Sequence, residues 1–259
     1  MSLNIAGMPA MPIGPISSPM DFSGSTELGL YVTETTQKHV MGRRSISWDG
    51  SVYRYGKAGA AITSTQMAIH TEDTGAGVSY EVITAAAAIG DTTLKITEAS
   101  ITKDEYAGGY IVIFETGSSG GFVRGIVSNT ASDSANGVVL TLDGPLHVAL
   151  TTADAYELFP NPWDSLSQAN VSGTISFCGM PLVTVADLSY FWTKTWGPIF
   201  IAPQSGVGAA YVKTGYFRHD GSIDVRGNIG TYVLDQIAGY CMIGSASGDG
   251  PLFMLTVGI

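Results

Sequence analysis

The sequence predicts an all-β protein in which two β-sandwich or barrel-like domains follow an extended, proline-rich N-terminal arm. Short alternating runs of β-branched and aromatic residues recur between turns rich in glycine, aspartate and serine. The chain lacks the sustained 3.6-residue periodicity of amphipathic helices. Four prolines interrupt the first 20 residues, and this density excludes a helix and disfavours a central strand there.

The composition of the 259-residue chain bounds its class. Charged residues make up 13%, about half of the ~25% usual in soluble domains, whereas hydrophobic residues make up 45%. The longest apolar runs, such as residues 110–114, have the length of a strand, far below the ~20 residues of a membrane-spanning helix. We expect no membrane partner. A chain this apolar exposes nonpolar surface as a monomer, so subunit contacts are expected to cover it.

The net charge of −10 repels phosphate backbones, and the only adjacent basic pair is Arg43-Arg44. We therefore expect no nucleic-acid partner. No positively charged segment precedes an apolar core at the N-terminus, so no secretion signal is expected. Cys178 and Cys241 lie far apart without metal-ligand spacing. Buried free thiols are the expected state, and a disulfide is the alternative.

The N-terminal arm is expected to comprise residues 1–24. It carries no charge before Asp21, and its aliphatic side chains alternate with prolines. About 20 residues in polyproline II conformation, at ~3.1 Å each, reach ~60 Å. We expect the arm to lie on a neighbouring subunit, and a disordered terminus is the alternative. The candidate contact residues of the arm are Met8, Met11, Ile13, Ile16 and Phe22.

The first β domain is expected at residues 25–164. The alternating runs 44–48 and 51–55 flank Asp49-Gly50. This pattern predicts a β-hairpin with a two-residue type I′ turn. Further strands are expected at 78–83, 92–97, 110–114, 122–127, 138–142 and 155–159.

Residues 165–180 have weak periodicity and are expected to form a linker or long loop. The second β domain is expected at residues 181–259, where 232–238 fits a strand or a short helix. Its other strands are expected at 182–185, 190–195, 199–201, 207–214, 217–225, 240–243 and 252–257.

Sequence motifs give little support for catalysis, so we expect no enzyme and no cofactor. None of the four histidines has metal-ligand spacing, and His219-Asp220 fits a surface turn better than a catalytic dyad. Asp220, Ser222 and Asp224 alternate as the first calcium ligands of an EF-hand loop do, but the later ligands of that loop are absent. A glycoside hydrolase remains an alternative, which requires two carboxylates ~5 to 9.5 Å apart.

Four tryptophans complete the candidate contact residues. Packing in a core or a subunit interface is the expected role of Trp48, Trp163, Trp192 and Trp196. The alternative is a sugar-stacking surface, as in a carbohydrate-binding or receptor-binding spike or tail-fibre module.

Several segments, in order along the chain, resemble a loose family of tailed-bacteriophage proteins encoded beside the major capsid protein, the capsid decoration or cement proteins. The first segment combines a glycine-arginine stretch, a two-residue turn and the aromatic-arginine-aromatic run Tyr53-Arg54-Tyr55. The arm and residues 205–235 depart from the family pattern. The resembling segments are residues 42–59, 105–113, 138–150 with 156–162, 183–197, 237–240 and 251–257.

The resemblance implies a structural virion protein without an active site. Such a protein binds the outer capsid surface and bridges neighbouring major capsid proteins, typically as a homotrimer. The resemblance also implies assembly in the host cytoplasm.

Overall fold

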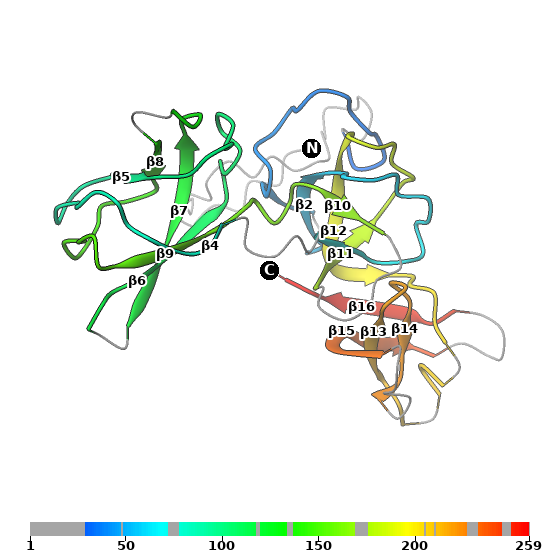
Figure 1. Ribbon diagram of the computed structural model, residues 1–259. Coiled ribbons are helices and arrows are strands. Elements are labelled where there is room, and N and C mark those ends of the chain that lie inside the picture. The colour runs from blue at the N-terminus through cyan, green and yellow to red at the C-terminus, as the bar shows by residue number, and fades with distance from the viewer. Residues whose placement is uncertain are drawn as a thin grey trace, which may run out of the picture.

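The all-β expectation is confirmed. In the computed structural model, the secondary-structure elements of the described residues are the β-strands β1 to β16 (Figure 1). Across this part of the chain no helix is long and apolar enough to cross a membrane. The structure describes residues 29–47, 49–71, 78–117, 120–133, 137–168, 176–204, 206–209, 211–226, 233–244 and 250–258.

The larger of two curled sheets has ten strands in the order β10-β3-β11-β12-β16-β15-β13-β14, and β2 joins it by pairing with β12 while β1 pairs with β2. All of the pairings in this sheet are antiparallel. Its strands are β1 (Arg44–Ile46), β2 (Val52–Lys57), β3 (Ile69–Thr71), β10 (Leu166–Ser167), β11 (Phe177–Pro181), β12 (Tyr190–Ile199), β13 (Thr214–Arg218), β14 (Ile223–Asp224), β15 (Val233–Ile243) and β16 (Leu252–Thr256).

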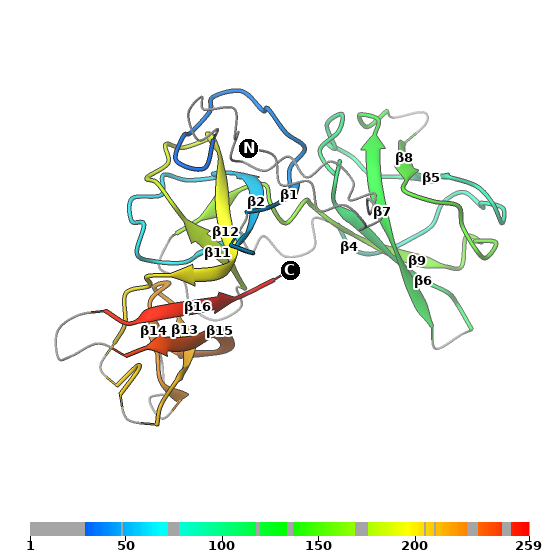
Figure 2. The same ribbon diagram turned by 180° about the vertical axis from the view of Figure 1, so that it is seen from behind.

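The smaller sheet has six strands in the order β4-β9-β6-β7-β8-β5. Figures 1 and 2 show these strands gathered in a lobe of their own. Its strands are β4 (Val78–Val82), β5 (Thr93–Ile96), β6 (Tyr110–Phe114), β7 (Gly121–Asn129), β8 (Val138–Leu142) and β9 (Ala155–Phe159).

The strand pairing divides the chain differently from the expected bounds 25–164, 165–180 and 181–259. Strand β2 pairs with β12 along Tyr190↔Lys57 to Trp196↔Val52, and β3 pairs with β10 and β11. The six-stranded sheet is therefore an insertion between β3 and β10. The expected linker contains β10 and all of β11 except its last residue, Pro181. Pairing between strands more than 100 residues apart leaves no local signal in the sequence, so the insertion was missed.

Most locally specified strands are confirmed. The expected bounds 110–114, 138–142 and 155–159 agree with β6, β8 and β9, and residues 233–243 form one strand instead of a helix. The expected strands at 182–185 and 207–214 are wrong. Residue 185 makes only an isolated bridge to Ile62. Gly208 has a φ of 82° and donates its N–H to Val212 O, so the chain turns there.

The first hairpin is confirmed, but its turn type is not. The N–H of Ser47 donates to Ser51 O at 2.9 Å, and the N–H of Gly50 donates to Ser47 O at 3.0 Å. These bonds, with a φ of 81° at Gly50, define a three-residue connection with a bulge at the glycine. Asp49 explains the change, because its carboxylate accepts hydrogen bonds from both Ser47 and Ser51.

Each sheet has its own core. In the six-stranded sheet, inward side chains from all six strands meet around Ile111, Ile113 and Leu140, each 0% exposed, and β4 contributes the partly buried Val78. The ten-stranded sheet has three clusters, centred on Phe217 and Phe253, on Ile69 and Phe191, and on Tyr55 with its neighbours.

Candidate functional site

The most extended candidate for an interaction surface is the outward side of the six-stranded sheet. Strand β6 is apolar at every position, with Ile111 and Ile113 pointing into the core and their neighbours pointing away from it. Tyr80 is 65% exposed and Val123 is 54% exposed. We call this surface the outer apolar face, and it comprises Tyr80 and Val82 from β4, Tyr110, Val112 and Phe114 from β6, and Val123 from β7.

Strand register brings these side chains together. Val112 is paired with Val123 on one side and with Glu157 of β9 on the other. Strands β4 and β6 lie on either side of β9. Val82 of β4 and Phe114 of β6 are both paired with Ala155 of β9, whose small side chain leaves room for the larger side chains beside it. The rings of Tyr80 and Phe114 consequently lie 5.4 Å apart, centroid to centroid. Aromatic and aliphatic side chains thus adjoin on this side of the sheet. The carboxylate of Glu157 stands in the middle row, and that of Asp143 stands beside Gly125, which pairs with Tyr110.

Sequence reasoning missed this face because residues 110–114 were interpreted only as a strand, without asking which of its two sides is exposed. An antiparallel strand with one solvated side normally alternates apolar and polar residues. The run Tyr-Ile-Val-Ile-Phe does not alternate, and that departure was the available signal.

A second exposed apolar patch lies on β15 and β16. Ala238 and Cys241 point into the core, whereas Tyr240 and Met242 point outward and are 49% and 47% exposed. Ile243 pairs with Leu252 at the end of the two strands, and both side chains are exposed.

The structure places the predicted contact residues in different environments. Trp192 is 4% exposed and packs with Leu30, Tyr53 and Tyr55. Its ring lies 5.2 Å from that of Tyr55 and 5.4 Å from that of His39, so it is a core residue. Trp196 is partly exposed within β12. Met8, Met11, Ile13, Ile16, Phe22 and Trp48 lie outside the described residues.

Trp163 is the predicted residue that borders a cleft. The cleft has a volume of about 270 Å³ and is lined by Arg54, Trp163, Cys178, Thr195 and Gln236, among others. The guanidinium carbon of Arg54 lies 5.8 Å from the centre of the Trp163 ring. Burial raises the pKa of Cys178 to about 12, so its thiol stays protonated near neutral pH and is a poor nucleophile. Both cysteines are free, and Cys241 is buried.

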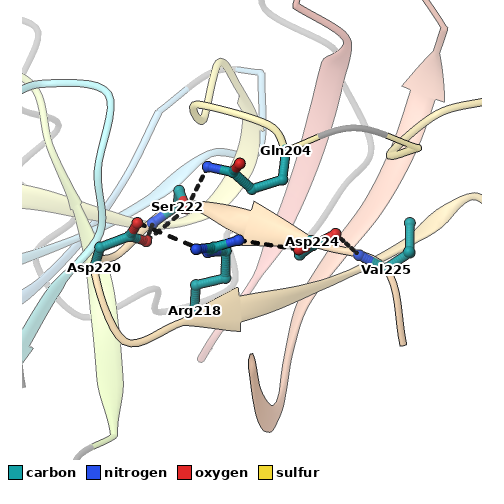
Figure 3. Close-up of polar contacts among 6 residues, drawn as sticks. All are labelled: Gln204, Arg218, Asp220, Ser222, Asp224 and Val225. Atoms are coloured by element: carbon teal, nitrogen blue, oxygen red, sulfur yellow. Dashed lines mark hydrogen bonds and ion pairs between the residues drawn. The ribbon is translucent and has the colours of Figure 1, made fainter. Parts of the chain in front are cut away.

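Asp220, in the turn between β13 and β14, and Asp224 of β14 both contact Arg218 at the end of β13 (Figure 3). Arg218 Nη1 lies 3.2 Å from Asp224 Oδ2, and Arg218 Nε lies 3.7 Å from Asp220 Oδ2. Asp220 Oδ1 also accepts from the N–H and the hydroxyl of Ser222, at 3.0 and 2.5 Å. The carboxylates of Asp220 and Asp224 thus already have donors within the protein as partners. Within the described ranges, no group of three or more His, Cys, Asp or Glu side chains could hold a metal ion.

Of the two carboxylate pairs in the sequence, one can be placed. Glu105 accepts hydrogen bonds from the N–H and the hydroxyl of Thr102, at 2.7 and 3.0 Å, and thereby closes a surface turn. Its neighbour Asp104 lies 3.8 Å from the exposed Lys103 ammonium. The pair Glu72-Asp73 lies outside the described residues.

Comparison of the chain with protein-family models, with curated protein sequences and with solved structures gave no match. The functional argument therefore depends on the surfaces and the cleft described above.

Proposed function

We propose that the chain is a non-enzymatic structural subunit of a phage virion. It binds the outer surface of the capsid and stabilises the shell by bridging neighbouring major capsid proteins. The single observation that carries the proposal is the outer apolar face, whose aromatic and aliphatic side chains are exposed in the isolated chain. Monomeric soluble proteins rarely expose contiguous apolar surface unless a partner covers it.

The physical work in this proposal is burial of apolar area across joints between capsid subunits. Each 100 Å² of apolar surface removed from water stabilises a contact by roughly 2.5 kcal/mol. Contacts of this size become decisive when many copies bind one shell, because bridging links the sites. The net charge of −10 favours the outer surface over the wall that faces packaged DNA. Homotrimers at three-fold positions would place such bridges symmetrically.

The copy number in purified virions of the source phage tests the proposal. Quantitative mass spectrometry is expected to give a ratio to the major capsid protein near one, or a simple fraction such as one third. A handful of copies per particle would move the assignment to a vertex or tail component. Complete absence from the virion would overturn the proposal.

Binding to capsids assembled without this chain locates the contact. The face variant Tyr80→Asp with Val123→Asp is expected to bind at least tenfold more weakly than the natural sequence. Tyr211 is 99% exposed and lies outside the face, so Tyr211→Asp is the matched control and is expected to bind normally. Equal binding by the face variant and the control would remove the face from the capsid contact.

A carbohydrate-binding or receptor-binding spike is the second candidate, and the cleft beside Trp163 favours it. A partly exposed indole next to a guanidinium is suited to stacking on a sugar ring and to holding its oxygen atoms. Screening the chain against host-cell glycans, with Trp163→Ala as the comparison, tests this candidate. Binding that disappears in the variant would support a receptor-binding role, and no binding to any glycan would remove it.

A further inference from the structure

The proline-rich N-terminal segment and the outer apolar face have complementary chemistry. Prolines stand at positions 9, 12 and 15, and aliphatic residues stand at positions 10, 13 and 16. A polyproline II helix has three residues per turn, so this spacing puts the prolines along one edge and the aliphatic side chains along another. Segments of this kind bind surfaces lined with aromatic rings, because their conformation is already extended and little entropy is lost.

The outer apolar face supplies such a surface. Tyr80, Tyr110 and Phe114 present three aromatic rings, and two of them lie 5.4 Å apart. A proline ring can pack on each aromatic ring, and the tyrosine hydroxyls can donate hydrogen bonds to the exposed carbonyls of a polyproline II helix. Val82 and Val123 flank the aromatic residues and offer contacts for the aliphatic edge.

The length of the segment fits the face. Residues 8–16 span ~28 Å in polyproline II conformation, whereas four adjacent strands are ~14 Å wide. One segment can cross the whole face from β4 to β7.

We infer that the outer apolar face is the docking site for the N-terminal arm, residues 8–16, of a second copy of this chain. The face is exposed, with Tyr80 at 65%, Val82 at 54% and Tyr110 at 45%, and a repeated subunit is held together by contacts between copies, so we assign the arm to a second copy. The contact joins two different surfaces, so successive copies form a closed ring when the rotation between them closes. The inference rests on the proposed role as a repeated structural subunit. In that role the face holds neighbouring copies together, and the face variant binds capsids more weakly because its copies no longer bind the shell as one linked unit. The test of the inference needs no shell.

Complementation between two full-length variants tests the inference. The face variant Tyr80→Asp with Val123→Asp keeps its arm, and the arm variant Pro12→Asp with Ile13→Asp keeps its face. Each alone is expected to sediment as a monomer near 27.0 kDa, and an equimolar mixture is expected to sediment at about 54 kDa. Unchanged thermal unfolding confirms that each variant is folded. A mixture that stays monomeric although both variants are folded overturns the inference.

Cysteine crosslinking provides a second measurement that does not depend on disrupting the face. A chain with Ile13→Cys is mixed with a chain with Val82→Cys and oxidised, and mixed disulfide dimers are expected. Ile243 is 65% exposed on β15, so Ile243→Cys is the matched control and is expected to give at least tenfold less dimer. In the double variant Ile13→Cys with Val82→Cys, a disulfide formed only within one chain would overturn docking between copies.

The capsid experiments separate the two ideas. In one outcome the face variant loses capsid binding, and the crosslink and the complementation both fail. The face then contacts the capsid protein, so the inference is overturned and the proposed function stands. If the crosslink forms but the virion lacks the chain, the inference stands and the proposed function falls.

Discussion

The side-chain amide of Gln236 on β15 pairs with the backbone of Phe177 on β11. The N–H of Phe177 donates to Gln236 Oε1 at 2.8 Å, and Gln236 Nε2 donates to Phe177 O at 2.7 Å. In the sheet order β11 and β15 are separated by β12 and β16. The amide thus takes the place of a neighbouring strand at the end of β11 and ties two distant parts of the ten-stranded sheet together.

Gln236→Ala is therefore expected to lower the free energy of unfolding by about 1–3 kcal/mol, because both backbone groups of Phe177 lose their partner. Urea unfolding followed by circular dichroism measures this loss. Gln37 is exposed and bonds only to the backbone two residues away, so Gln37→Ala is the control and is expected to change stability by less than about 0.5 kcal/mol. Equal stability of the two variants would show that the pairing contributes nothing.

Asp154 predicts a dependence of stability on pH. Its carboxylate accepts the N–H groups of Thr151 and Thr116, both at 2.7 Å, and the Thr151 hydroxyl at 3.0 Å. These hydrogen bonds hold the pKa of Asp154 below its ordinary value, against the opposing effect of burial. Because the folded-state pKa is depressed, the stabilisation is present above the unfolded-state pKa of about 3.9 and is lost as the pH falls through the folded-state pKa.

Asp154→Asn is accordingly expected to destabilise the protein by about 1–2 kcal/mol at pH 7, and by progressively less as the pH falls below about 4. Unfolding midpoints in urea from pH 7 to pH 2.5 measure the difference. The exposed Asp187 provides the control Asp187→Asn. A destabilisation by Asp154→Asn that is the same at every pH would contradict a role for the ionised carboxylate.

The sequence predicts what is local in this fold. The meander strands 110–114, 138–142 and 155–159 are apolar runs between turn residues, and the structure has the same bounds. The pairing of β2 with β12 depends on side chains more than 100 residues apart, so local patterns could not predict the insertion. The outer apolar face could be predicted only in part, since non-alternating residues 110–114 show an apolar outward side but not that Tyr80 joins it.

A substitution at Gly50 tests how much backbone conformation contributes to the stability of the first hairpin. It has a φ of 81°, and a Cβ added there meets nothing within 4 Å. Gly50→Ala is thus expected to cost about 1 kcal/mol through backbone strain alone. Gly144 is equally open but lacks a positive φ, so Gly144→Ala is expected to be neutral or slightly stabilising. Thermal unfolding of both variants makes the comparison, and equal midpoints would contradict the strain at Gly50.

Trp192 and Trp163 are expected to differ in how much each side chain contributes to the stability of the fold. Trp192 is 4% exposed and packs against Tyr55 and His39, so Trp192→Ala is expected to destabilise the protein by about 3–5 kcal/mol. Trp163 borders an open cleft, so Trp163→Ala is expected to cost less than half as much. Urea unfolding followed by circular dichroism compares the two. The opposite order would mean that Trp163 anchors the core, and the cleft beside it would then lose its case as a ligand site.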